Sequence, residues 1–164
     1  MTTATPAYGS TTTHTISLAS LSSDTNLVAG REGTAIDNTT EDAIDAMVGG
    51  KVTTGTSPTA SKQIEVWAYG SYDGTSYSGG ASGSDANLTP QASAKSLLRL
   101  LTIIPTSSTS NQTYTWGPFS VAAAFGGVLP KKWGIYIVHN TGVALNSTAG
   151  NHEVKHTPIK FESA

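Results

Sequence analysis

Residues 130–142 alternate apolar side chains with a period of two, which is the period of a β-strand rather than a helix. One side of this strand would carry Trp133, Ile135, Ile137 and His139. The other side carries Tyr136 and Val138, so it also has side chains that favour burial. Such a strand is typical of the centre of a sheet that is covered on both faces. We therefore predict that this segment is the central strand of a β-sandwich, with Trp133 facing the main core.

Seven further segments have strand-like patterns bounded by turn residues. They cover residues 16–21, 27–32, 44–54, 62–70, 97–104, 113–116 and 154–160. Two of them have helical alternatives, namely a short helix over residues 43–47 and a helix that continues from Pro90 into residues 97–104. We favour a strand with a bulge at Gly49-Gly50 for the first and a buried strand for the second.

The pattern as a whole predicts an all-β fold, a single-domain two-sheet β-sandwich of jelly-roll-like or immunoglobulin-like type. A chain of 164 residues can bury about 70% of its unfolded surface, so one core suffices without disulfides or metal. Residues 1–11 are mostly Thr, Ala, Pro, Gly and Ser, with no core-forming pattern. We expect them to be an extended N-terminal arm, mobile in the isolated protein, and residues 12–164 to be the sandwich domain.

Two segments are candidates for contact with other molecules. The arm contains Thr5, Pro6 and Tyr8, and we expect these residues to contact another copy or a larger surface. Residues 71–87 form a long loop rich in Gly and Ser that contains Tyr72 and Tyr77. A loop of this length is either a mobile tip or a contact surface, so both tyrosines are also candidate interface residues.

The composition excludes several kinds of partner. The chain has no cysteine, only 12% charged residues and a net charge of −2. It therefore has no basic patch of the density that nucleic acid or an anionic membrane requires, and no apolar run long enough to span a bilayer. Short hydroxyl side chains, which are abundant here, lose little entropy when they are covered. Such a surface suits a protein that packs against neighbours.

No set of residues predicts catalysis, cofactor binding or metal binding. His152 to His156 match the zinc-protease pattern His-Glu-x-x-His, with Glu153 in the position of the base. That pattern needs a helix, whereas Val154 and Pro158 favour a strand here. The acidic residues between Asp37 and Asp45 lack the spacing of a calcium loop and are better explained as turn and helix-cap residues. We therefore expect no enzyme activity, no cofactor and no metal.

Several short segments resemble a family of small virion proteins of tailed bacteriophages. They are residues 27–32, 46–55, 62–67, 126–134 and 139–142, and the resemblance extends over about residues 25–155. Proteins of this family are similar to capsid decoration (cement) proteins. The resemblance implies a β-sandwich that binds the major capsid protein on the outside of an icosahedral shell and stabilises it. It also implies a homo-oligomer, a dimer or a trimer, that is made in the host bacterial cytoplasm and ends on the capsid surface of the virion.

Two other functions fit the same pattern. One is a β-sandwich component of a tail fibre or baseplate of the same kind of particle. The other is a carbohydrate-binding module that would use Trp67, Tyr69, Tyr72 and Tyr77 as a stacking platform. Aromatic residues on a strand are more often core residues or cross-strand pairs than a sugar platform.

Overall fold

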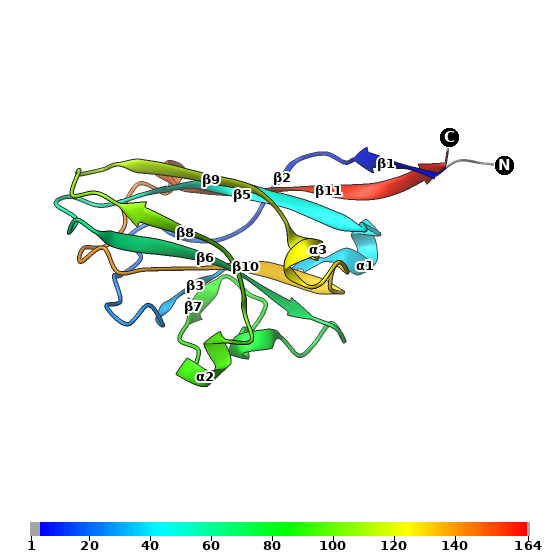
Figure 1. Ribbon diagram of the computed structural model, residues 1–164, viewed down its shortest axis with the longest axis horizontal. Coiled ribbons are helices and arrows are strands. Elements are labelled where there is room, and N and C mark those ends of the chain that lie inside the picture. The colour runs from blue at the N-terminus through cyan, green and yellow to red at the C-terminus, as the bar shows by residue number, and fades with distance from the viewer. Residues whose placement is uncertain (1–3, 164) are drawn as a thin grey trace.

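The computed structural model describes residues 4–163, which form two antiparallel β-sheets packed face to face (Figure 1). Sheet A has five strands in the order β1-β11-β5-β9, with β2 also paired to β11. These strands are β1 (Ala4–Tyr8), β2 (Thr12–Thr13), β5 (Asp45–Thr53), β9 (Thr113–Ser120) and β11 (Glu153–Ser163). The all-β, two-sheet sandwich that the sequence predicts is therefore confirmed.

Sheet B has six strands in the order β7-β3-β10-β6-β8, with β4 also paired to β10. They are β3 (Gly30–Glu32), β4 (Ile36–Asp37), β6 (Lys62–Ser71), β7 (Ala86–Leu88), β8 (Arg99–Thr106) and β10 (Lys132–His139). Helical segments are short and lie between strands. They are α1 (Asn38–Glu41), η1 (Ser78–Gly80), α2 (Ala92–Lys95), α3 (Val121–Ala124) and η2 (Ala149–Asn151). None of the helices in residues 4–163 has the length and apolar character needed to cross a membrane.

Strand β10 is central in sheet B and is buried along almost its whole length. Trp133, Ile135 and Ile137 face sheet A and pack in the main core with residues of β5, β6 and β11. Tyr136 and Val138 face the other way and belong to a second, smaller core. The two-sided burial predicted from the alternation of this strand is confirmed.

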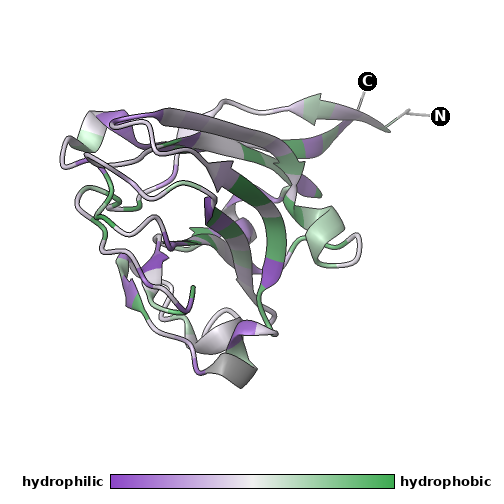
Figure 2. Ribbon diagram, turned by 60° about the vertical axis from the view of Figure 1, so that its left-hand side comes forward, coloured by the Kyte–Doolittle hydropathy of each residue, from purple (hydrophilic) through white to green (hydrophobic). Residues whose placement is uncertain are grey.

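The second core lies on the outer face of sheet B, under the chain between β6 and β8. Figure 2 shows hydrophobic stretches along the strands of the two sheets. Tyr69 and Tyr136 are fully buried there, and the Tyr69 hydroxyl donates a 2.5 Å hydrogen bond to the Gly33 carbonyl. The Tyr69 ring lies against Gly134, where any side chain would overlap the ring. Residues 71–87, expected to be a long loop that is either a mobile tip or a contact surface, therefore pack in part on sheet B.

Several predicted elements differ from the structure. Residues 16–21 are irregular, although Leu18 is buried in the main core. Residues 44–54 do form a strand, β5, with a register shift between Val48 and Gly50, so the favoured interpretation is confirmed over the helix. Residues 99–106 do form a strand, β8, so the favoured interpretation is confirmed over the helix. It is an edge strand in which Ile104 is buried while Leu100 and Ile103 are exposed, so the predicted burial holds on one side only.

The N-terminal arm takes part in sheet A. Residues 4–8 form β1, which pairs antiparallel with the end of β11, from Ala4 opposite Ser163 to Tyr8 opposite Ile159. These residues are extended, as expected, but the pairing with the end of β11 conflicts with the expectation that they are mobile in the isolated protein. Residues 1–3 of the expected arm lie outside the described residues.

Candidate interaction surfaces

One exposed part of the fold is a two-stranded ribbon formed by β1 and the end of β11. Strand β5 pairs with β11 only as far as Asp45 opposite Ile159. Beyond Ile159, β11 has β1 on one side and no strand of sheet A on the other, among the strands that residues 4–163 form. Figure 1 shows this ribbon projecting from one end of the sandwich, near both ends of the chain. An isolated two-stranded ribbon is marginally stable in water, so it gains from contact with another surface.

The ribbon is amphipathic because its two strands place apolar residues on the same side. Pro6 lies opposite Phe161 and Tyr8 lies opposite Ile159, so these four side chains share one face. The residues on the other face are Thr5, Ala7, Lys160 and Glu162. Tyr8 is 73% exposed and Phe161 is 58% exposed, so no other part of the described chain covers the apolar face.

The candidate interface residues do not form one surface. Thr5, Pro6 and Tyr8 lie together in β1, where all three are exposed. Tyr72 follows β6 in the other sheet and is 83% exposed. Tyr77 is half-buried, with its ring edge-on to Tyr69 at a centroid distance of 5.7 Å, so it is part of the second core.

Phe161 and Ile159 complete the apolar face of the ribbon, and the sequence analysis did not identify them. Their alternation with Lys160 and Glu162 was visible in the sequence, but their exposure was not. A second exposed apolar strip contains Leu97, Leu100 and Ile103, at the outer side of edge strand β8. It was missed because the continuous apolar run indicated burial.

The outer face of sheet A has a shallow hollow over the paired glycines of β5. It has a volume of about 350 Å³ and is bordered by Thr11, Met47, Thr115 and Thr157 among other residues. Gly49 and Gly50 form its floor, at the bulge opposite β9. A side chain at Gly50 would overlap the carbonyl of Glu153, so the close pairing of β5 with β11 requires a glycine there. The hollow therefore results directly from the bulge.

The chain that covers sheet B is fixed by buried charges. The Lys95 ammonium lies 2.6 Å from the Glu65 carboxylate and 4.9 Å from the centre of the Trp67 ring. The Trp67 indole N–H donates to the same carboxylate at 2.9 Å. Glu32 accepts hydrogen bonds from the backbone and hydroxyl of Ser82. These contacts hold the segment in place, and they leave no free acid or base in the cover.

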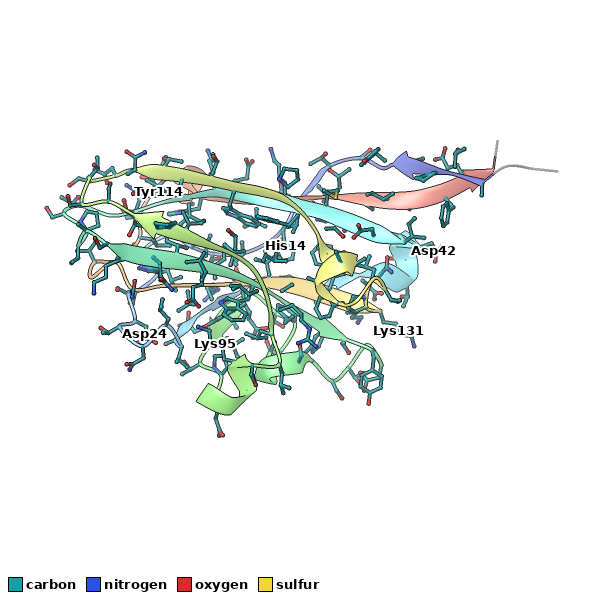
Figure 3. The ribbon with its side chains drawn as sticks, in the orientation of Figure 1. His14, Asp24, Asp42, Lys95, Tyr114 and Lys131 are labelled. Atoms are coloured by element: carbon teal, nitrogen blue, oxygen red, sulfur yellow. The ribbon has the colours of Figure 1, made fainter. Side chains whose placement is uncertain are left out.

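Tight turns around this cover are also fixed by carboxylates. Backbone N–H groups of Ser76 and Thr75 and the Ser71 hydroxyl donate to Asp73, and they hold the pKa of Asp73 well below its usual range. Asp24 accepts from the backbone of Ala29 and other residues of its own turn, which lowers its pKa as well. Figure 3 labels Asp24 and Lys95 beside sheet B. Both carboxylates have structural partners, which explains their ionised state without catalysis.

The aromatic residues considered as a sugar platform do not share an exposed face. Tyr69 is fully buried, and Tyr77 packs edge-on against it. Trp67 is partly covered by Lys95. Tyr72 is exposed, but it does not share a face with the other rings. A stacking platform needs several neighbouring exposed ring faces. The arrangement therefore removes the structural basis of the carbohydrate-binding alternative.

The His-Glu-x-x-His segment is not helical. His152 ends a short helical turn and Glu153 begins β11, so the chain between the two histidines is nearly extended and their Cα atoms lie about 13 Å apart. His152 Nε2 lies 2.8 Å from the Asn146 carbonyl, while His156 is buried between the sheets. Among residues 4–163, no three His, Asp or Glu side chains come close enough to hold a metal ion.

The acidic residues between Asp37 and Asp45 include a helix cap, as the sequence analysis suggested. The N-cap of α1 is Asp37, which accepts from the Thr39 backbone at 3.0 Å. Asp45 accepts from the Ser120 hydroxyl at 2.6 Å and from the Ala122 backbone at 2.8 Å. These hydrogen bonds occupy carboxylate oxygens that a calcium ion would need.

Two histidines are buried beside Trp133 in the main core. His14 stacks with Trp133 at a centroid distance of 6.0 Å and meets His156 edge-on at 6.4 Å (Figure 3 labels His14). None of the four imidazole nitrogens has a hydrogen-bond partner among the described residues. Burial, and then the neighbouring His156, lower the pKa of His14 to about 3. His14 is therefore neutral at pH 7 and contributes packing rather than charge.

Among the described residues, the features that suit a function are therefore an exposed apolar ribbon, a hollow on the same sheet and a second apolar strip on β8. Catalytic function would need convergent reactive groups, and the acids and histidines described above have structural roles. Comparison of the chain with protein-family models, with curated protein sequences and with solved structures found no match.

Proposed function

We propose that the protein is a capsid decoration protein of a tailed bacteriophage, which binds the major capsid protein on the outside of the shell and stabilises it. Its sites of action are surfaces rather than an active site. The protein is made in the host cytoplasm and is carried on the outer surface of the virion. It works as a homo-oligomer, without cofactor, metal, nucleic acid or membrane.

The observation that carries this proposal is the projecting ribbon with its uncovered apolar face. A rigid sandwich holds the ribbon at one end, so Tyr8 and Phe161 are presented to a neighbour at little cost in entropy. One such contact is small. A homo-oligomer holds several copies together, so it can bind neighbouring sites of a shell at the same time.

The surface chemistry supports the same proposal. Only 12% of the residues are charged, and the turns carry carboxylates that are already paired, so covering this surface desolvates few free charges. The resemblance to small virion proteins, described under Sequence analysis, points to the same class. A tail-fibre or baseplate protein would need the same kind of surface. The position of the protein on the particle distinguishes this alternative from a decoration protein.

Localisation on intact virions tests the proposal. Particles of the phage that encodes the protein would be labelled with gold-conjugated antibody and imaged by electron microscopy. The proposal expects label distributed over the head. Label confined to the tail would establish the tail alternative, and unlabelled particles that contain no copy of the chain by mass spectrometry would refute a virion role.

A further inference from the structure

We infer that the outer face of sheet A is an interface between two copies of this chain, in which the apolar ribbon of each copy lies over the glycine hollow of the other. The inference rests on the homo-oligomer of the proposed function and names the surface through which it forms. It can fail separately, because self-association is measured on the purified protein without capsid shells.

The ribbon provides the projecting part of this interface. Along β11, Val154, His156 and Pro158 are buried toward the core, so the alternate residues face outward. Phe161 therefore lies on the outer side of sheet A, and its neighbours across the ribbon place Pro6 on the same side. The apolar face of the ribbon and the outer face of sheet A are thus continuous.

The hollow provides the receiving part. It opens on the same outer face, over Gly49 and Gly50, and its volume of about 350 Å³ is large enough for an aromatic side chain. Lys155 lies at its rim, where it pairs with Glu153 at 2.9 Å. An aromatic ring that enters the hollow meets the ammonium of Lys155, which is a favourable contact.

The spacing of the two parts suits a two-fold axis. Phe161 is six residues from Lys155 along β11, a distance of about 20 Å in a strand. When two copies pack face to face with their β11 strands antiparallel and the axis at Pro158, position 161 of each copy falls over position 155 of the other. Both ribbons are then engaged at once, as an isologous contact requires.

The polar features of the ribbon favour packing by the face rather than by the edge. The Gly9 N–H bonds the Pro158 carbonyl, so Gly9 points its backbone groups toward β11. In a strand, the backbone N–H and C=O groups of successive residues point to opposite edges. Pro6 is three residues from Gly9, so its nitrogen, which lacks a hydrogen, faces the open edge of β1. This proline interrupts strand addition at that edge. The apolar face carries no charge that a second copy would repel.

The size of the contact predicts a weak dimer. The outward strip of β11 from Glu153 to Phe161 is about 27 Å long, and with a strand on each side it is about 15 Å wide. Two copies would bury on the order of 1,000 Å² in total, at the lower end of specific interfaces. We therefore expect a dissociation constant in the micromolar range.

Sedimentation equilibrium on the purified chain tests the inference. The wild-type protein should approach twice the 16.8 kDa mass of the chain as its concentration rises. The variant Tyr8→Ser/Phe161→Ser should dissociate at least about 30-fold more readily, because two aromatic contacts are lost. Thr115→Trp, which fills the hollow from its exposed rim, should have a similar effect without altering the ribbon. Tyr72→Ser changes an equally exposed tyrosine in the other sheet and is the matched control.

Disulfide cross-linking gives a positional test, because the chain has no cysteine of its own. In the variant Lys155→Cys/Phe161→Cys the two thiols lie about 20 Å apart within one chain, too far for an internal bond. Mild oxidation should therefore link two chains, whereas Lys155→Cys/Tyr72→Cys should stay monomeric under the same conditions. A protein that remains monomeric up to about 200 µM, or a dimer that both interface variants leave intact, would overturn the inference. So would a ribbon that binds capsid shells but not a second copy.

Discussion

Acidification should destabilise the fold through His14, and the size of the effect follows from its burial. The pKa of His14 is about 3 in the folded protein, against an ordinary value of 6.5 when the chain is unfolded. The unfolded state therefore binds a proton that the folded state excludes. The stability that neutral His14 provides is complete above pH 6.5 and is lost as the pH falls from 6.5 toward 3. The loss is about 3 kcal/mol at pH 4.5, because this pH lies about two units below the pKa of the unfolded state and each unit is worth about 1.36 kcal/mol.

Little near His14 offsets this cost. It packs against His156 and the Trp133 ring, and Asp85 is the only carboxylate that acts to raise its pKa, as the weakest of the three influences. Urea unfolding followed by tryptophan fluorescence would measure the free energy of unfolding at pH 7.5 and pH 4.5. The variant His14→Phe keeps an aromatic ring but does not titrate, so its loss between these pH values should be smaller by about 3 kcal/mol. An equal loss in both proteins would refute the assignment of this proton to His14.

Three substitutions test the two cores, each by the same unfolding measurement. Ile135→Ala removes a fully buried side chain of the main core and should cost about 2–5 kcal/mol, and an unchanged midpoint would show that the inward face of β10 is misassigned. Lys95→Met leaves the Glu65 carboxylate buried without its cation and should cost about 2–4 kcal/mol, whereas stability equal to wild type would mean that the ion pair has no structural role. Gly134→Ala should cost at least about 2 kcal/mol, since the new methyl group overlaps the Tyr69 ring, and a neutral result would show that the ring can move aside.

The sequence predicted those parts of the fold whose residue pattern lies within a single strand. In β10 the alternation is long and apolar on both sides, so both the strand and its double burial could be read directly. The bulge in β5 was visible for a similar reason, because two adjacent glycines interrupt an otherwise regular alternation. In each case the signal is local and does not depend on knowing the neighbouring strand.

The parts that were not predicted depend on partners distant in the sequence. The arm pairs with the end of β11, about 155 residues away, and no local pattern in residues 4–8 indicates that pairing. The apolar run before Pro105 suggested burial, but its place at the edge of sheet B follows from strand order. Of the candidate contact residues, Tyr8 and Tyr72 are exposed while Tyr77 is half-buried, because the loop that contains Tyr77 folds back onto sheet B.

Binding to empty shells is the most direct test of the proposed decoration function. Shells assembled from the major capsid protein of the same phage, without this chain, would be mixed with increasing amounts of purified protein and pelleted. The account predicts binding that saturates at a fixed ratio to the shell subunit, together with a higher temperature of shell disruption. It also predicts weaker binding by Tyr8→Ser/Phe161→Ser than by Tyr72→Ser, because the proposal rests on the ribbon. Shells that pellet without the protein at every concentration, and that break at an unchanged temperature, would contradict the account.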